Sequence, residues 1–196
     1  MKTSKGASYK VLAKNCFVLE DLTLRPITEY QMDSIRKWRN SQIPVLRQNS
    51  TISWRNQRAY FKKRVFPEMG RLKPVQILFA IERCGSFVGY GGLTNIEWVA
   101  RKAEISFLLN PSIKEGKDDY LNIFDIFLRL VTNVAFDDLV LSRLFTETFS
   151  SRVEHIAILK NNGFILEGRL RQHCVVDGVV LDSLMHGKLK QEDTIL

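Results

Sequence analysis

Two ionisable side chains lie within apolar segments of this sequence, where they could exchange protons with a bound molecule. Glu104 lies in the run KAEISFLL, residues 102–109, and His155 lies in an amphipathic segment that ends near Asn161. A carboxylate can act as a general base, and an imidazole can take up a proton or order a water molecule. Both have structural alternatives, because Glu104 could pair with Arg101 or another cation and His155 could be hydrogen-bonded within the fold.

Other kinds of chemistry have no support in the motifs. The chain has no Gly-x-Ser-x-Gly nucleophile elbow, and its GYGG segment lacks the Gly-Lys-Ser/Thr of a phosphate-binding loop. The histidines and cysteines have no metal-ligand spacing: His155, His173, His186, Cys16, Cys84 and Cys174. We therefore expect no metal, and we expect free thiols in a reducing cytoplasm.

Composition indicates one soluble domain. The chain has 196 residues, of which 45% are hydrophobic and 26% charged, and this length is enough to bury a substantial core. No apolar run approaches the roughly 20 residues of a membrane span, and the basic N-terminus lacks the apolar stretch of a signal peptide. We expect a flexible basic arm over residues 1–16, a single domain over 17–190 and a tail over 191–196.

The net charge of +8 is unevenly distributed. Residues 1–75 carry 16 Lys and Arg against 5 Asp and Glu, whereas residues 76–196 carry 13 against 16. The basic first part could face an anion such as a nucleotide, a phosphorylated substrate or RNA, or it could be a solvated basic surface. Nucleic acid is the weaker anionic partner, because the chain has no RNA-binding aromatic motif and no Lys/Arg block.

Hydrophobic periodicity and turn residues predict an alternation of strands and helices. Strands are expected at residues 17–20, 22–27, 76–81, 87–96, 102–109 and 144–149. Helices are expected from Thr28, which can form a capping box with Gln31, from Ser53 to about Phe66, and over residues 121–136. This order predicts an α/β fold in which a mixed central sheet carries helices on both faces.

The last third of the chain forms a recognisable unit. The amphipathic segment 152–161 stops before Gly163, which suits the left-handed residue just past a helix end. Phe164 restarts an apolar run, and VVDGVV, residues 175–180, is typical of two strands closed by a tight turn. In this order of helix, Gly-Phe and hairpin the chain resembles the GNAT-type N-acetyltransferases, in particular the branch that acetylates protein N-termini, antibiotics and amino sugars.

The resemblance implies a single-domain GNAT fold in which the strand 102–109 diverges from the next strand and opens a wedge in the sheet. In such proteins, exposed backbone groups at the wedge pair with the pantetheine arm of acetyl-CoA. The matching residues here are Phe107, Leu108 and Leu109. The resemblance also makes Glu104 the general base that takes a proton from the acceptor ammonium, usually through water.

The resemblance is incomplete where the pyrophosphate of the cofactor should bind. The Gly-rich loop of the relatives is reduced to Gly116, flanked by Lys114 and Lys117. Asp118 and Asp119 follow, where they would repel anions or cap the next helix. Either Lys114 and Lys117 replace part of the usual phosphate-binding loop around Gly116, so that all three residues bind the cofactor, or the chain binds CoA poorly.

The segment 152–161 also departs from the family pattern. Counting back from Gly163-Phe164, Arg152 stands where many relatives have an Asn that contacts the cofactor. Leu159 stands where they have a Tyr that protonates the departing thiolate. We expect Arg152 to contact the cofactor and His155, one helical turn before Leu159, to transfer a proton.

The acceptor pocket is expected around Trp38, Arg39 and Asn40, because a similar Trp-Arg-Asn occurs in amino-sugar acetyltransferases of this branch. Trp38 could stack on a sugar or base, and Arg39 could bind phosphate. The rival interpretation makes Trp38 part of the core and Arg39 a surface charge. Tyr90 lies among glycines that could leave room for the acceptor.

The sequence therefore predicts an acetyl-CoA-dependent N-acetyltransferase that works without a metal, as a monomer or homodimer, on a small primary amine. The preferred acceptor is a nucleotide-linked amino sugar, and a protein N-terminus is the second choice. Two alternatives stay open. One is a non-catalytic protein of the same fold that binds an acyl-CoA, a nucleotide or a protein partner, and the other is an RNA- or ribosome-binding module.

Overall fold

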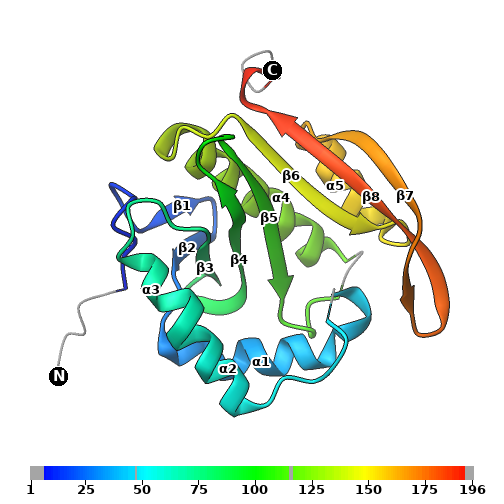
Figure 1. Ribbon diagram of the computed structural model, residues 1–196, viewed down its shortest axis with the longest axis horizontal. Coiled ribbons are helices and arrows are strands. Elements are labelled where there is room, and N and C mark those ends of the chain that lie inside the picture. Colours follow the sequence, from blue (N-terminus) through cyan, green and yellow to red (C-terminus); the bar gives the residue numbers. More distant parts are fainter. Residues whose placement is uncertain (1–6, 47, 115–116, 193–196) are drawn as a thin grey trace.

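The computed structural model describes residues 7–46, 48–114 and 117–192, and within them eight strands form one sheet (Figure 1). The strand order is β1-β2-β3-β4-β5-β6-β8-β7. The strands are β1 (Phe17–Leu19), β2 (Leu22–Pro26), β3 (Ile77–Arg83), β4 (Ser86–Glu97), β5 (Lys102–Leu109), β6 (Arg143–Phe149), β7 (Ile165–Val176) and β8 (Val179–Leu189). The α-helices are α1 (Met32–Ser41), α2 (Trp54–Tyr60), α3 (Phe66–Met69), α4 (Asp118–Asn133) and α5 (Val153–Asn161). Short 3-10 or π segments are η1 (Glu29–Gln31), η2 (Ile43–Val45), η3 (Phe61–Val65), η4 (Val134–Asp138) and η5 (Lys190–Glu192).

Two helices begin where the sequence predicts. Thr28 and Gln31 form the capping box before α1, in which the Gln31 side chain accepts from the Thr28 N–H at 2.9 Å. Ser53 caps α2 by accepting from the backbone N–H of Asn56 at 3.2 Å. Each cap satisfies backbone donors that the first helical turn leaves without a partner. The caps therefore fix the start of η1, which runs directly into α1, and the start of α2.

Helices cover both faces of the sheet, as expected. On one face, α4 packs against alternate strand residues, which include Ile105. On the other face, α1 and η3 pack against a second set, which includes Leu108. Because side chains alternate along a strand, Glu104 and Ser106 share the second face with Leu108.

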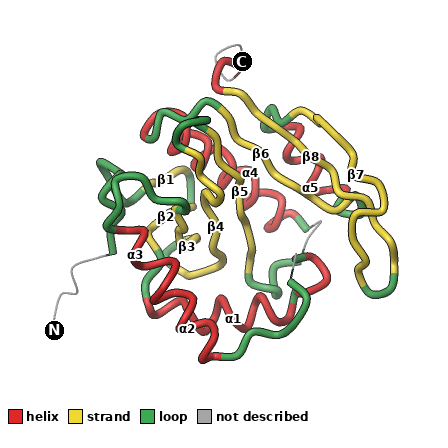
Figure 2. The backbone as a smooth tube through the Cα atoms, viewed as in Figure 1, coloured by secondary structure: helices red, strands yellow, loops and turns green. Residues whose placement is uncertain are grey.

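The sheet opens between β5 and β6, which are its parallel neighbours. These strands pair at three positions, the last of which joins Glu104 to Phe145. Beyond that pair β5 continues to Leu109 and β6 to Phe149, without further pairing between these described segments. Figure 2 shows the two strands diverging. This is the wedge that the family resemblance implies, and it lies on the predicted strand.

The N-terminal segment differs from the expectation of a flexible arm over residues 1–16. Tyr9 is 1% exposed and Leu12 is also buried in the core. The Tyr9 hydroxyl accepts from the Leu78 N–H at 2.8 Å and donates to the Leu78 carbonyl at 3.3 Å. Tyr9 and Leu12 therefore anchor this segment in the core, because an aromatic ring with a satisfied hydroxyl is stable there, whereas Ser8, Lys10, Ala13 and Lys14 are exposed. Residues 1–6 of the predicted arm and 193–196 of the predicted tail lie outside the described residues.

The glycines of β4 serve close strand packing, and this corrects the expectation that they leave room for an acceptor. A Cβ on Gly91 would lie 2.4 Å from the Ser106 carbonyl oxygen and 2.8 Å from the Phe127 ring. Gly92 has φ +143°, and a Cβ there would lie 2.2 Å from the Ile77 carbonyl oxygen. Both positions need glycine because neighbouring backbone occupies the space. No helix in the described part of the chain is long and apolar enough to cross a membrane.

Candidate active site

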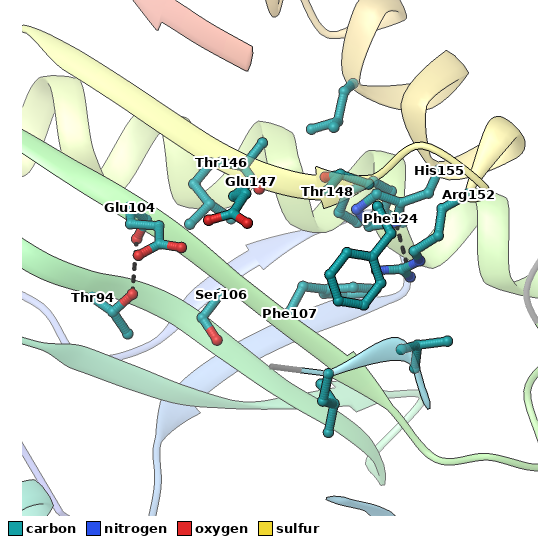
Figure 3. Close-up of a pocket in the computed structure, with 15 residues that line it drawn as sticks. Thr94, Glu104, Ser106, Phe107, Phe124, Thr146, Glu147, Thr148, Arg152 and His155 are labelled. Carbon is teal, nitrogen blue, oxygen red and sulfur yellow. Dashed lines mark hydrogen bonds between the residues drawn. The ribbon is translucent and has the colours of Figure 1, made fainter. Parts of the chain in front are cut away.

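A small cavity of about 130 Å³ lies where β5 and β6 separate (Figure 3), and we call it the apex cavity. Its polar lining comes from both strands, from β4 and from α5: Thr94, Glu104, Ser106, Thr146, Glu147, Thr148, Arg152 and His155. Three other cavities share walls with it. The helix-side cavity, about 410 Å³, shares Thr94 and Ser106, and the outer groove, about 290 Å³, shares Phe107 and Arg152. The hairpin cavity, about 460 Å³, shares Glu147.

Glu104 lies at the apex, at the last position where β5 and β6 pair. It is 5% exposed, and its Oε2 accepts from the Asn95 side-chain amide at 2.6 Å. Its backbone carbonyl accepts from the Thr94 hydroxyl at 3.4 Å (Figure 3). The sequence thus brings the predicted base to the wedge, with an amide that orients the carboxylate. Pairing with Arg101 is not what the structure shows, because the Arg101 guanidinium donates to the Val140 carbonyl.

A second carboxylate in the apex cavity was missed by sequence reasoning. Glu147 lies on β6, two residues beyond Phe145, and it therefore shares a face with Glu104. Its side chain is 11% exposed and lines both the apex cavity and the hairpin cavity. Figure 3 shows both carboxylates directed into the apex cavity, one from each of the diverging strands. The alternation of side chains in RLFTETF places Glu147 on one face of this strand, but the sequence does not show which face is buried.

His155 and Arg152 form a buried cluster with Tyr120. Arg152 donates to the Tyr120 hydroxyl at 2.6 Å and to His155 Nδ1 at 3.3 Å. His155 also stacks on Phe124, with ring centroids 3.9 Å apart. Burial, then the nearby Arg152 and His186, holds the pKa of His155 well below its usual value. His155 is therefore neutral, and Nδ1 carries its lone pair because a guanidinium can only donate.

The outer groove follows β5 away from the apex. Leu108, Leu109 and Lys114 line it, and Arg152 stands where it joins the apex cavity. The Phe107 ring packs against α4, with its centroid 4.6 Å from that of Phe124, so its backbone is what β5 offers to the wedge. The Leu109 carbonyl accepts from Gln42 Nε2 at 2.9 Å. An unpaired strand edge beside an apolar groove suits an extended ligand that carries amide groups.

The helix-side cavity lies on the opposite side of the apex, between β4 and the helices α1 and α2. Arg39 lines it, and its Nη1 donates to the Tyr90 hydroxyl at 2.8 Å while its Nε donates to Gln48 at 3.0 Å. Among the described residues, the side-chain partners of Arg39 are the neutral Gln48 and Tyr90. Burial raises the pKa of Tyr90, and the Arg39 charge opposes that shift. Within the part of the chain that the structure describes, this cavity therefore presents a cation whose hydrogen-bond partners are neutral.

Comparison with known proteins assigns the family. Residues 24–185 match the family described as "Acetyltransferase (GNAT) domain". The chain belongs to this family. Among solved structures, spermidine N-acetyltransferase from Vibrio cholerae in complex with CoA and spermine has a TM-score of 0.75 at 18% identity, covering 88% of this chain and 97% of that chain. A probable acetyltransferase has a TM-score of 0.68 at 23% identity, covering 90% of this chain and 97% of that one.

These comparisons confirm the GNAT fold, and acetyl-CoA-dependent N-acetyltransferase is the enzyme class of the family. They give no support for an amino-sugar acceptor, because similar solved structures whose substrate is known are spermidine N-acetyltransferases. One structure of the Vibrio cholerae enzyme is dodecameric, which is a property of that protein.

The GNAT pyrophosphate region is described only in part. Lys114 lines the outer groove and Lys117 is the N-cap of α4, whereas Gly116 lies outside the described residues. Of the two alternatives for Asp118 and Asp119, capping is not what the structure shows, because Lys117 is the N-cap and both aspartates lie in the first turn. The Asp119 carboxylate pairs with the guanidinium of Arg83 at 2.7 Å, which reduces its repulsion of an anion.

The GNAT acceptor residues predicted from Trp-Arg-Asn separate into different roles. Arg39 and Tyr90 line the helix-side cavity, but Trp38 and Asn40 line none of the four cavities defined above. Trp38 stacks on Phe87 with centroids 4.7 Å apart. Asn40 Oδ1 accepts from the N–H of Ile52 at 2.8 Å and its Nδ2 donates to the Ile52 carbonyl at 2.9 Å. Trp38 is therefore partly buried against the core, and Asn40 fixes a loop.

Proposed function

We propose that this chain transfers an acetyl group from acetyl-CoA to a small primary amine. The observation that supports this most directly is the end of the β5–β6 pairing at Glu104, which leaves an unpaired β5 edge and a carboxylate at one apex. The pantetheine amides would pair with the backbone of Phe107, Leu108 and Leu109 as another strand would. The thioester would then lie beside Glu104.

In the proposed reaction, Glu104 takes a proton from the acceptor ammonium, directly or through a water molecule, and so frees the nitrogen lone pair. The nitrogen attacks the thioester carbon, so that a C–N bond forms and the C–S bond breaks, with its electron pair going to sulfur. The nitrogen gives up a second proton, which neutralises the thiolate. The products are an N-acetyl amine, CoA and one proton.

Cations along the outer groove would hold the phosphates of the cofactor. Lys114 lines the groove, Lys117 lies at the N-terminus of α4, and Arg152 stands where the groove meets the apex cavity. A helix N-terminus adds backbone donors for an anion. We assign His155 the role of holding Arg152 in place rather than the proton transfer expected from the sequence, because its Nδ1 is engaged by the Tyr120 hydroxyl at 2.9 Å and by the Arg152 guanidinium at 3.3 Å.

The acceptor would enter from the helix-side cavity, with its ammonium at Glu104 and its remainder near Arg39. A guanidinium with neutral neighbours favours an anionic group, which it can bind with two parallel hydrogen bonds. A nucleotide-linked amino sugar has both an amine and phosphates, so we propose it as the preferred acceptor. A protein N-terminus is the second choice.

The experiment is a calorimetric titration of the protein with acetyl-CoA and CoA, followed by measurement of CoA release with a panel of amines. The panel contains a nucleotide-linked amino sugar, the same amino sugar without its nucleotide, a peptide with a free N-terminus, and spermidine. Micromolar binding and turnover of the nucleotide-linked sugar would support the proposal. Binding without turnover of any amine would favour a non-catalytic protein, and no binding at millimolar acetyl-CoA would refute the cofactor assignment.

A further inference from the structure

Glu147 forms the wall between the apex cavity and a second, open space. On one side its carboxylate lines the apex cavity together with Glu104, and on the other side it lines the hairpin cavity. The hairpin cavity is bounded by η2, the loop after it and the β7–β8 hairpin. Glu147 is therefore the one acidic side chain of the described residues that both cavities share.

His173 continues this line toward solvent. Its Nε2 lies 3.5 Å from Glu147 Oε1 across the hairpin cavity, and the imidazole is 47% exposed whereas the Glu147 side chain is 11% exposed. An imidazole can accept a proton on one ring nitrogen and release one from the other. The pair therefore connects a buried carboxylate to a group that exchanges protons with water.

The proposed acetyl transfer creates a need for such a connection. Each turnover leaves one proton on the base, and Glu104 is only 5% exposed. The base must lose this proton before it can serve the next acceptor. Loss through the outer groove or the helix-side cavity would have to wait until the cofactor product or the acetylated acceptor leaves.

We infer that Glu147 and His173 form the proton exit of this active site, an inference that rests on the proposed function. The Glu104 carboxyl gives its proton to the Glu147 carboxylate, directly or through water in the apex cavity, and Glu147 passes it to His173 Nε2. His173 releases a proton from Nδ1 to solvent. Glu104 and Glu147 both end as carboxylates, and the net result is one proton delivered to water.

The other charged groups that line these two cavities, among the described residues, do not offer this path. On the apex side, Arg152 has no acceptor atom, and His155 Nδ1 is engaged by the Arg152 guanidinium. On the hairpin side, the charged group besides His173 in the described lining is Asp177, which lies in the exposed β7–β8 turn. Among the described residues, Glu147 and His173 are therefore the proton-accepting pair that leads from the apex cavity into the hairpin cavity.

The experiment compares Glu147→Gln and His173→Gln with the matched control Asp177→Asn, which removes a charge from the same cavity. Asn tolerates the positive φ of 49° at that position. In weak buffer we expect kcat to fall about 100-fold for Glu147→Gln and His173→Gln, toward the lower end of what a proton-transfer group contributes. The KM for acetyl-CoA should not change, and Asp177→Asn should keep the wild-type kcat.

Chemical rescue separates proton transfer from a structural role. Added imidazole should restore kcat of His173→Gln in a concentration-dependent way, because the hairpin cavity of about 460 Å³ admits it. Wild-type kcat in both variants, or a loss that imidazole leaves unchanged, would overturn the relay. If wild-type protein acetylates an amine and Glu104→Gln does not, such a result overturns the relay alone. If the wild-type protein turns over no amine, the proposed function and the relay both fall.

Discussion

Replacing Glu104 by Gln tests the centre of the proposed mechanism with little change in shape. The amide oxygen of the new side chain can still accept from Asn95, which now donates to Glu104 Oε2 at 2.6 Å. Gln cannot take a proton from an ammonium, so the acceptor must bind already neutral. General-base catalysis contributes about 10²- to 10⁴-fold, which corresponds to about 3–5 kcal/mol of barrier at about 1.4 kcal/mol per factor of ten.

The activity of Glu104→Gln should depend on pH, because the variant can use only the neutral form of the acceptor amine. Below the pKa of the acceptor ammonium, which is about 8 for an α-amino group and about 10 for an alkyl amine, the neutral fraction of the acceptor rises about tenfold per pH unit. The activity of Glu104→Gln should therefore rise about tenfold per pH unit until the pH reaches the pKa of the acceptor and level off above it, while the deficit relative to wild type shrinks. Steady-state release of the CoA thiol, measured for wild type and variant across this pH range, gives the rise in activity and the deficit. Calorimetry should give an unchanged affinity for acetyl-CoA, because the β5 backbone is intact.

Glu97→Gln is the control, because Glu97 is a carboxylate of β4 that is 59% exposed and pairs with Lys102 at 3.2 Å. It should keep wild-type activity and affinity. A Glu104→Gln protein with wild-type kcat at pH 7 would refute the assignment of the base. A deficit of the same size at every pH would mean that the carboxylate acts by binding the acceptor rather than by taking its proton.

Three further predictions test packing and acceptor charge. Gly91→Ala should lower the free energy of unfolding by about 1–3 kcal/mol, because its methyl would overlap a β5 carbonyl and an α4 ring. Gly168→Ala, where a Cβ meets nothing within 4 Å, is the matched control in thermal unfolding. Tyr9→Phe should cost about 1–3 kcal/mol in urea unfolding, because a buried backbone N–H loses its acceptor, whereas Tyr30→Phe, at 87% exposure, should cost nothing measurable. Arg39→Gln should raise the KM of a phosphate-bearing acceptor about 10- to 100-fold, which corresponds to the free energy that a hydrogen bond to a charged group contributes. An equal rise in KM for an amine without an anionic group would contradict the proposal that Arg39 binds the acceptor's anion.

The sequence predicts most of the fold because its elements are locally consistent. Thr28 and Ser53 mark helix starts through side chains that reach only three residues along the chain. Apolar runs of strand length predict β3, β4 and β5, and Asp177-Gly178 predicts the turn, since both residues adopt positive φ. The sequence also predicts that Glu104 lies at the wedge, because the strand that carries it, residues 102–109, matches the family pattern as a whole.

What the sequence could not predict depends on contacts between distant segments. Tyr9 looks like part of a basic arm until its hydroxyl is seen to bond Leu78, which is 69 residues away. Glu147 alternates with polar threonines, so its strand does not show which face is buried. Trp38 and Arg39 are adjacent, yet on a helix neighbouring side chains point about 100° apart, and only Arg39 reaches the cavity.

The arrangement of charges indicates how an acceptor would be oriented. Glu104 and Glu147 lie at the apex, Arg39 lies in the adjoining helix-side cavity, and the two cavities share Thr94 and Ser106. An amine that is also an anion can place each charge beside its opposite. A polyamine such as spermidine would place a second ammonium in the cavity that Arg39 lines, and like charges there would weaken its binding. The Vibrio cholerae enzyme shares the fold, but folds host many substrates. Arg39 is therefore the residue that argues for a different acceptor here.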